Sequence, residues 1–262
     1  MIFLFPSDYF NPKQVDEMYA GQVSALNNVG LNTAVISLES LGSKLPKINP
    51  PISQNSYVVY RGWMLSPLDY ELLVNAVDST GSSAFTSKAE YLLTHYLPNW
   101  YPLIADLTPA TKFYTVDDHL ETELKILGWE RFFIKDYVKS LKTSSGSILE
   151  QPSEIRTVVT QMQKFRGTIE GGICVRQVED FVVESERRYF VVSGQPFSAS
   201  LDEEIPYIVK ECAVRIPSKF FCVDVVDRQD GVKRIVEIGD GQVSDIVGWS
   251  AERFAQIWGG NS

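Results

Sequence analysis

Hydrophobic residues along the chain follow two spacings, and their order predicts a mixed α/β fold. Short apolar runs bounded by polar or turn residues indicate strands, and apolar residues at helical spacing indicate amphipathic helices. The predicted strands cover residues 2–5, 33–37, 56–60, 131–135, 172–176, 188–193, 220–226 and 234–238. The predicted helices cover residues 12–28, 67–77, 87–104 with an interruption at Pro98, 153–165, 203–215 and 250–258.

The order of these elements divides the chain into two predicted domains. The opening β-α-β-β-α pattern indicates a small α/β domain over residues 1–85, with ligands expected beyond the carboxyl ends of its strands. Residues 86–262 form the second domain. Residues 46–53 are predicted to be a loop and residues 108–111 a turn. Ser153 is expected to cap a helix, and Pro206 to lie in the first turn of another.

Charge and composition exclude several classes of function. The net charge of −9 argues against sequence-independent binding to a nucleic-acid backbone, although basic residues cluster between Arg131 and Lys142. No apolar run reaches the length of a membrane span, and the N-terminus is predicted to be a first strand and not a signal peptide. The three cysteines lie singly in apolar segments, as expected of reduced core residues in a cytoplasmic protein. With two histidines, a His-based triad or zinc site has little to draw on.

Two carboxylates near the C-terminus give the strongest indication of chemistry. Asp224 follows an apolar run, a short polar turn comes next, and Glu237 lies in the following apolar run. Adjacent antiparallel strands would bring the two together, and close carboxylates repel unless a cation lies between them. Oxygen ligands without Cys or His suit magnesium, which shares its coordination with waters and phosphates. The alternative is a solvated strand end at Asp224 and a surface ion pair at Glu237.

A basic loop follows the strand over residues 131–135. Residues 136–147 contain lysines, hydroxyls and a glycine, and such a loop can hold a polyphosphate, although the spacing differs from a P-loop. The alternative is a solvated loop. Lys135 differs from the loop lysines because it directly follows apolar residues at a strand end, where it can reach a ligand.

Two further strands carry polar residues at their ends. Residues 171–179 pass from an apolar strand into a polar segment whose backbone groups could bind an adenine edge; an ordinary buried strand is an equally good interpretation. Residues 184–188 place Glu186 and two arginines at the start of another strand. One guanidinium can face a phosphate, and the alternative is a surface Glu–Arg pair.

In this order, the features resemble the ATP-grasp superfamily of carboxylate–amine ligases. Residues 133–143, the upstream Arg61-Gly62-Trp63 and the downstream residues 236–244 are similar to a small bacterial and phage branch named for one arginine and two lysines. The resemblance covers nearly the whole chain, and the downstream segment is specific. It implies an ATP-grasp fold (α/β, α+β) with a small N-terminal pre-ATP-grasp domain, and ATP and Mg²⁺ as cofactors.

The resemblance assigns roles to individual positions. Lys135 matches the lysine that contacts nucleotide phosphates, and Lys139 or Lys142 matches the second lysine, in the loop near residues 136–147 that closes over ATP. The hinge that meets adenine corresponds to Arg176, Gln177 and Val178. Glu186 and Arg188 match the acid-x-Arg motif, with the arginine facing the transferred phosphoryl group. Asp224 and Glu237 match the magnesium ligands, and Arg61 is expected to face the site.

This chain departs from the superfamily pattern at two positions. Gly239 stands where many members have Asn, two residues after the metal-binding Glu, and Asp240 is a candidate for the missing oxygen ligand. The helix before the Thr108-Pro109-Ala110-Thr111 turn lacks the usual lysine. Candidate substitutes for that lysine are Lys88, His95 and Lys112.

The resemblance implies an ATP- and Mg-dependent ligase that joins a carboxylate to an amine through an acyl-phosphate. Its substrates are expected to be small molecules or peptides, with no membrane partner and no nucleic acid; the sequence does not fix an oligomeric state. Three alternatives stay open: a nucleotide-binding protein of the same fold without ligase activity, an ATP-dependent phosphotransferase, and an interaction protein that uses the Arg61-Gly62-Trp63 surface.

Overall fold

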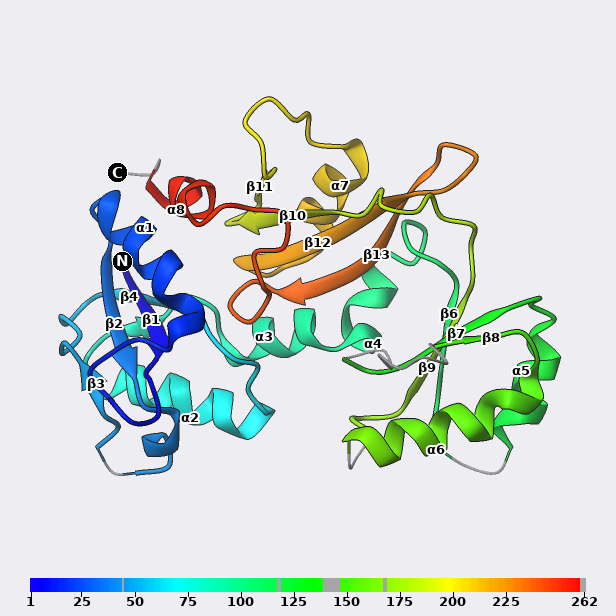
Figure 1. The fold of residues 1–262 in the computed structure, drawn as a ribbon, viewed down its shortest axis with the longest axis horizontal. Helices are drawn as coiled ribbons and strands as arrows, with labels where there is room; N and C mark the ends of the chain where they lie inside the picture. Colours follow the sequence, from blue (N-terminus) through cyan, green and yellow to red (C-terminus); the bar gives the residue numbers. More distant parts are fainter. Residues whose placement is uncertain (44, 117–118, 139–146, 167–168, 260–262) are drawn as a thin grey trace. The chain divides into compact units, whose positions relative to one another are not determined.

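The computed structural model describes residues 1–43, 45–116, 119–138, 147–166 and 169–259. The chain forms two compact units (Figure 1). The first contains Met1–Thr94, Arg187–Val223 and Gly239–Ser262, and the second contains His95–Glu186 and Asp224–Ile238. The fold is mixed α/β, as the sequence predicts.

A five-stranded sheet in the order β3-β2-β1-β4-β5 organises the first unit. Its strands are β1 (Ile2–Pro6), β2 (Asn32–Ile36), β3 (Ile48–Asn49), β4 (Tyr57–Tyr60) and β5 (Ser83–Ala84). All neighbours pair in parallel except β2 and β3. The helices of this unit include α1 (Ala20–Asn28), α2 (Pro67–Asp78), α3 (Lys88–His95) and α8 (Ala251–Gly259).

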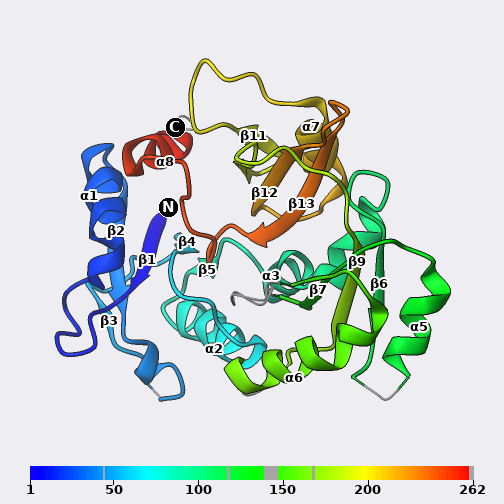
Figure 2. The same ribbon diagram turned by 45° about the vertical axis from the view of Figure 1, so that its right-hand side comes forward.

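The central strand β1 is buried on both faces. Phe3 and Phe5 pack into a cluster with residues of α1 and α8, whereas Ile2 and Leu4 pack into a second cluster with residues of α2. Figure 2 shows α1 and α8 beside one another. Successive strand residues point to opposite faces, so a fully apolar strand is what a sheet covered by helices on both sides requires.

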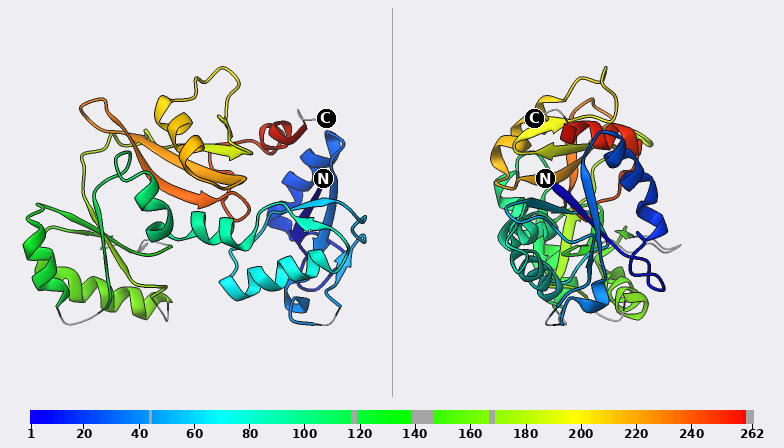
Figure 3. Two further views of the ribbon diagram at one scale, coloured as in Figure 1. Left: turned by 180° about the vertical axis from the view of Figure 1, so that it is seen from behind. Right: turned by 90° about the vertical axis from the view of Figure 1, so that its left-hand side faces the viewer.

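A second four-stranded sheet, in the order β6-β9-β7-β8, lies entirely within the second unit, and its neighbouring strands pair antiparallel. Its strands are β6 (Thr111–Tyr114), β7 (Phe132–Asp136), β8 (Ile148–Leu149) and β9 (Ile173–Gln177). The helices are α4 (Leu97–Trp100), α5 (Leu120–Leu127) and α6 (Ile155–Arg166). Helices α5 and α6 cover one face of this sheet (Figure 3) and form a hydrophobic core with it.

The remaining sheet has the order β11-β10-β12-β13. Its strands are β10 (Arg187–Val192), β11 (Gln195–Phe197), β12 (Phe220–Asp227) and β13 (Lys233–Asp240), and helix α7 (Tyr207–Arg215) precedes β12. The turn between β12 and β13 closes through hydrogen bonds between Arg228 and Val232 and from Gly231 to Arg228, and Gly231 has a positive φ of 86°. A left-handed residue at this point is what such a turn needs, and glycine adopts it without strain.

Several predicted helix starts differ from the structure. Helix α1 begins at Ala20 and not at Pro12, after a 3₁₀ turn over Glu17–Tyr19 that is capped by the Asp16 side chain. Helix α7 begins at Tyr207 and not at 203, because Pro206 is extended (ψ 146°) and lies before the first turn. Ser153 is not an N-cap: the capping residue is Gln151, and a 3₁₀ turn over Pro152–Glu154 leads into α6.

The helix predicted over residues 87–104 is three pieces, α3, α4 and a 3₁₀ turn over Tyr101–Leu103. The break falls at Tyr96, which is extended, and Pro98 lies in the first turn of α4 where its missing N–H costs nothing. Thr111, predicted to belong to a turn, is the first residue of β6. Strand β3 lies inside the predicted loop over residues 46–53. The strands missed are short or at a sheet edge, so their residues carry little periodicity.

Candidate active site

The sheet of the second unit separates its apolar side chains from its polar ones. On β7 and β9, Phe132, Ile134, Ile173 and Val175 face the core under α5 and α6. The alternate residues include Phe133, Lys135 and Arg176, which line a cavity. Because successive strand residues point to opposite faces, the pattern that builds the core also directs these charged side chains into the cavity.

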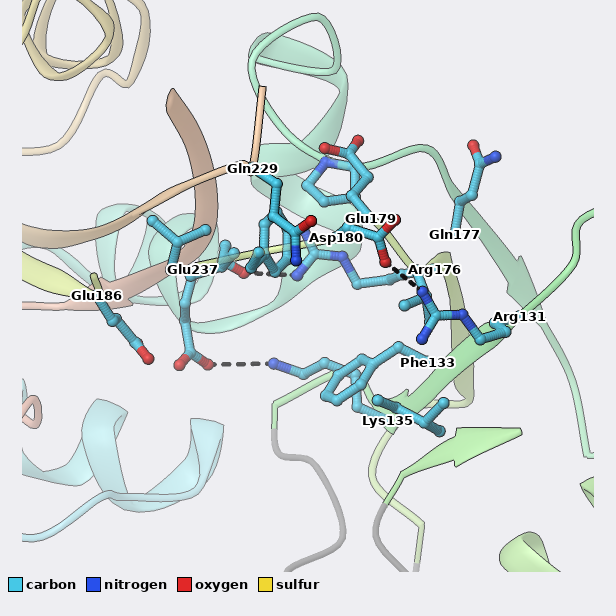
Figure 4. Close-up of a pocket in the computed structure, with 16 residues that line it drawn as sticks. Arg131, Phe133, Lys135, Arg176, Gln177, Glu179, Asp180, Glu186, Gln229 and Glu237 are labelled. Atoms are coloured by element: carbon cyan, nitrogen blue, oxygen red, sulfur yellow. Dashed lines mark hydrogen bonds and ion pairs between the residues drawn. The ribbon is translucent and has the colours of Figure 1, made fainter. Parts of the chain in front are cut away.

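The cavity has a volume of about 520 Å³, which is within the usual range for small-molecule sites. All of its lining residues belong to the second unit. They are Pro109, Arg131, Phe133, Lys135, Ile148, Arg176, Gln177, Val178, Glu179, Asp180, Phe181, Glu186, Val226, Gln229, Val236 and Glu237 (Figure 4). Five residues predicted as nucleotide-binding, Lys135, Arg176, Gln177, Val178 and Glu186, therefore meet in one cavity with the predicted metal ligand Glu237.

Lys135 and Glu237 point toward one another across the cavity (Figure 4). The Nζ atom of Lys135 lies 3.1 Å from Oε1 of Glu237. The lysine side chain is 7 % exposed and the glutamate side chain 42 % exposed, so one partner is held by the sheet while the other remains accessible. This ion pair places a fixed positive charge beside an accessible carboxylate.

The two arms of the β12–β13 hairpin differ by one residue between the hydrogen bonds at their two ends. Next to the turn, the backbone N–H of Arg228 donates to the carbonyl of Val232. At the far end, the N–H of Gly241 donates to the carbonyl of Phe220. From 220 to 228 the first strand advances 8 residues, whereas from 232 to 241 the second advances 9. A mismatch of one residue between paired strands is a β-bulge.

We assign the bulge to Val236 and Glu237. Both residues line the cavity, although successive residues of a regular strand point to opposite faces. If the pairing of Arg228 with Val232 is continued along the strands, Asp224 lies opposite Val236. If the pairing of Phe220 with Gly241 is continued from the other end, Asp224 lies opposite Glu237. Asp224 is buried and does not line the cavity; Val226, two residues further along β12, does. The bulge thus brings Asp224, Val236 and Glu237 to one face of the hairpin.

Arg176 is buried at the base of the cavity, with 5 % of its surface exposed. Its Nη1 donates to the carbonyl of Val236 and its Nη2 to the hydroxyl of Thr108, both at 2.5 Å. Its Nε is buried without a hydrogen-bond partner among the described residues. Burial lowers the pKa of Arg176 to about 10, which leaves the guanidinium charged at neutral pH. Arg176 therefore contributes a buried, charged side chain to the cavity.

Ion pairs hold the rim of the cavity. Arg234 binds Glu179 through two hydrogen bonds, Nε to Oε2 and Nη2 to Oε1, each 2.9 Å long. Both side chains are less than 20 % exposed, so this bidentate pair is only weakly screened by solvent. Arg131 and Asp180 form a more exposed pair with a separation of 2.5 Å.

Arg61 lies in the first unit and is not among the residues that line the cavity. It is 1 % exposed and donates to Gln22 and to the carbonyls of Gly241 and Ser244. Its guanidinium also stacks 4.6 Å from the ring centre of Phe254. These contacts tie the segment after β13 to the N-terminal sheet of the same unit.

Asp240 is also buried within the first unit. Its carboxylate accepts hydrogen bonds from the N–H and the side-chain amide of Gln242, at 3.0 and 3.2 Å, and from the hydroxyl of Thr94 at 3.3 Å. Burial raises its pKa to about 7. At the neighbouring Gly239 a Cβ would lie 2.6 Å from Oγ of Ser244 and 3.0 Å from Sγ of Cys222, so any larger residue there requires these two side chains to shift.

The other predicted residues fall in different places. Arg188 belongs to the first unit, donates to the carbonyl of Asp245 at 2.8 Å and does not line the cavity. Lys139 and Lys142 lie outside the described residues. Of the candidates for the missing helix lysine, Lys88 pairs with Glu71 at 2.6 Å, His95 is buried and Lys112 is exposed on β6.

Some cavity residues were not predicted from the sequence. Phe133 and Arg131 lie two and four positions before Lys135, so the period of a strand would have placed them on its face. Glu179, Asp180 and Gln229 come from loops, where no periodicity exists to indicate a direction. Among the described residues, no group of three or more His, Cys, Asp or Glu side chains could hold a metal ion.

Residues 126–258, slightly more than half of the chain, match a family model for the ATP-grasp domain. The model describes family 3 of the clade named for one arginine and two lysines. The chain belongs to the ATP-grasp family. This match covers the basic loop, strand β9 and the β12–β13 hairpin, where most of the predicted site residues lie. A comparison with curated proteins gives no match.

Solved structures of ATP-grasp proteins share the fold. The D-cycloserine synthetase DcsG has a TM-score of 0.65 at 14 % identity, with 99 % of each chain covered. The ATP-grasp ligase PsnB, in a complex with a phosphomimetic variant of its minimal precursor, Mg and ADP, has a TM-score of 0.64 at 12 % identity and covers 98 % of this chain and 95 % of its own. A RimK domain ATP-grasp protein from Sphaerobacter thermophilus DSM 20745 has a TM-score of 0.65 at 13 % identity, covering 97 % and 98 %.

Among the described residues, no helix combines the length and hydrophobicity that crossing a membrane requires.

Proposed function

We propose that this protein is an ATP- and Mg-dependent ligase that joins a carboxylate to an amine. The observation that carries the proposal is the cavity in which Lys135, Arg176 and Glu237 meet on the polar face of β7 and β9. Membership of the ATP-grasp family supports it, as do the complexes of PsnB with Mg and ADP. The substrates we propose are a small-molecule or peptide carboxylate and an amine. PsnB, and the macrocyclase MdnC, another solved structure with a similar fold, were each solved with a precursor peptide.

The residues of the cavity fit a magnesium nucleotide. Phe133, Ile148 and Val178 supply apolar walls for a base, while Lys135 and Arg176 supply positive charge for phosphates. Glu237 lines the cavity and Asp224 is buried on the neighbouring strand β12; both offer oxygen ligands only, which suits Mg²⁺ and not zinc. Two carboxylates are enough, because magnesium completes its coordination with waters and phosphate oxygens. Bound there, Mg²⁺ would offset the phosphate charge; Asp240, buried and already hydrogen-bonded, remains a weaker candidate ligand.

The chemistry asks the chain for positioning and charge, and for no side-chain nucleophile. An oxygen of the substrate carboxylate attacks the γ-phosphorus of ATP, ADP leaves and an acyl-phosphate forms. The amine nitrogen then attacks the carbonyl carbon, phosphate leaves and the nitrogen loses a proton. Lys135 holds a phosphate while Arg188 is proposed to face the transferred group, and fixed cations of this kind stabilise the charge that develops. The lysines at 139 and 142 are proposed to contact the phosphates, and Arg61 to stabilise the first unit without contacting the nucleotide.

Binding and product formation test the proposal separately. Calorimetric titration of ATP with and without magnesium should show magnesium-dependent binding that Lys135→Ala and Glu237→Ala weaken by about tenfold or more. Hydroxylamine added to the protein with ATP and a carboxylate library should trap acyl-phosphate as hydroxamate, and ADP should appear in step with it. A folded wild-type protein that binds no nucleotide would overturn the ligase proposal, and ADP release with transfer to an alcohol would favour a phosphotransferase.

A further inference from the structure

We propose that Thr108 and Arg176 are positioning residues that fix the β-bulge of β13 and so direct Glu237 into the cavity. The inference rests on the proposed function, because Glu237 is proposed there as a magnesium ligand. It assigns a role to Thr108, a residue that the sequence places only in a turn, and a second role to Arg176 besides its place in the hinge strand.

Thr108 and Arg176 form a continuous chain of hydrogen bonds to the bulge. The Thr108 hydroxyl donates to the carbonyl of Ile235 at 2.7 Å and accepts from Nη2 of Arg176 at 2.5 Å. Nη1 of Arg176 donates to the carbonyl of Val236 at 2.5 Å. Two consecutive backbone carbonyls, directly before Glu237, are thus held by one hydroxyl and one guanidinium.

The two carbonyls are bound by two side chains that are hydrogen-bonded to each other, and a regular strand would not offer both carbonyls on the same side. Successive carbonyls of a strand point toward opposite edges, so the contact from Arg176 and Thr108 requires the altered backbone that a bulge provides. Thr108 is fully buried and Arg176 is 5 % exposed, so water does not replace these hydrogen bonds. Loss of either partner leaves a buried carbonyl unpaired, and the bulge loses the contact that favours it over a regular strand.

The same segment covers the outer edge of β13. The N–H of Ile235 donates to the carbonyl of Leu107 at 2.9 Å, and Arg234 donates to the carbonyls of Asp106 and Thr108. Strand β13 is the last in its sheet, so its outer edge has no strand partner there. These other bonds remain when the Thr108 hydroxyl is removed, so a variant should keep the strand in place and change chiefly the bulge.

The chain offers a matched control in the same segment. Thr111 is also buried, and its hydroxyl donates to the carbonyl of Pro109 at 2.9 Å, a bond within its own segment. Thr108→Val and Thr111→Val each remove one buried hydroxyl while keeping the shape of the side chain. Thr108→Ser keeps the hydroxyl and should restore whatever Thr108→Val loses.

The test measures ADP affinity by calorimetry without magnesium and at saturating magnesium, with thermal unfolding run beside it. Thr108→Val should reduce the gain in ADP affinity caused by magnesium by about 10- to 100-fold, the effect expected when a metal ligand loses the hydrogen bonds that orient it. The ADP affinity without magnesium should change by less than about twofold. Thr108→Ser and Thr111→Val should keep the wild-type gain. If Thr108→Val does not fold, Thr108→Ala, which removes the same hydroxyl and does not touch a residue that lines the cavity, should show the same selective loss.

The possible failures are distinguishable. A folded Thr108→Val protein with the wild-type magnesium gain overturns the positioning role and leaves the proposed function intact. An equal loss in Thr111→Val also overturns it, because the effect would then come from removal of any buried hydroxyl. A wild-type protein that binds no ADP under either condition overturns the proposed function and this inference together.

Discussion

Arg61 and Arg176 are two buried arginines with the same ionisation but different surroundings. Burial lowers the pKa of each to about 10, and each donates to backbone carbonyls. Every nitrogen of Arg61 has a partner within its own unit, whereas Arg176 lines a cavity and keeps one buried N–H without a partner among the described residues. A buried charge is therefore not by itself a mark of function: its relation to a cavity separates a structural arginine from one in a site.

The largest expected effect is the loss of stability on replacing Arg61, the arginine that lies outside the cavity. Arg61→Ala leaves Gln22 and the carbonyls of Gly241 and Ser244 without their buried donor and opens a cavity beside Phe254. We expect the free energy of unfolding to fall by roughly 3–5 kcal/mol, measured by urea denaturation. The folded fraction should bind Mg-ATP as the wild type does. A loss below about 1 kcal/mol, or a selective loss of nucleotide affinity, would place Arg61 with Arg176 instead.

A second buried charge of the first unit predicts a dependence of stability on pH. Burial raises the pKa of Asp240 from 3.8 to about 7, so the folded state favours the protonated carboxyl. The stabilisation is complete below about pH 4 and is lost as the pH rises through about 7, because the folded protein must then bury a carboxylate that the unfolded chain ionises freely.

Asp240→Asn removes this ionisation and keeps an acceptor for Gln242. We expect the variant to be more stable than the wild type above about pH 8 by up to roughly 4 kcal/mol, and the difference to shrink below about pH 5. Urea denaturation across this range measures it. A pH-independent difference would show that the carboxylate is compensated, as it would be if Asp240 served as a metal ligand in the protein tested.

Replacing a charged residue that lines the cavity should change nucleotide binding and have little effect on stability. Lys135→Met keeps the apolar stem of the side chain and removes the charge beside Glu237. We expect Mg-ATP affinity to fall by roughly 10- to 100-fold, the loss of one or two charge-assisted hydrogen bonds, and the free energy of unfolding to change by less than about 1 kcal/mol. Lys88→Met, at the exposed pair with Glu71, is the matched control and should change neither. Unchanged affinity in Lys135→Met would remove Lys135 from the site.

The sequence predicted one part of this site better than the other. Lys135, Gln177 and Val178 lie at or next to the ends of short apolar runs that are recognisable as strands, and the family resemblance then gave them roles that are consistent with their shared cavity. The β13 bulge could not be predicted, because it depends on hydrogen bonds from Thr108 and Arg176, which are distant in sequence from Glu237. The burial of Arg61 and Asp240 was missed for a similar reason: polar residues were expected to face a ligand, and their partners come from separate segments of the first unit.

The smallest expected effect concerns Arg131 at the rim of the cavity, where the distinction between structural and binding charges is weakest. Its pair with Asp180 is partly exposed, with side-chain exposures of 35 % and 67 %, so solvent and salt screen it. Arg131→Ala should cost roughly 0.2–1 kcal/mol in the free energy of unfolding at low ionic strength and less at high salt. ATP affinity should change by less than about threefold, since the guanidinium is already engaged by Asp180. Calorimetry could instead give a loss of ATP affinity of about tenfold or more, with stability unchanged. Arg131 would then leave Asp180 to contact the nucleotide, and it would count among the binding residues with Lys135 and Arg176.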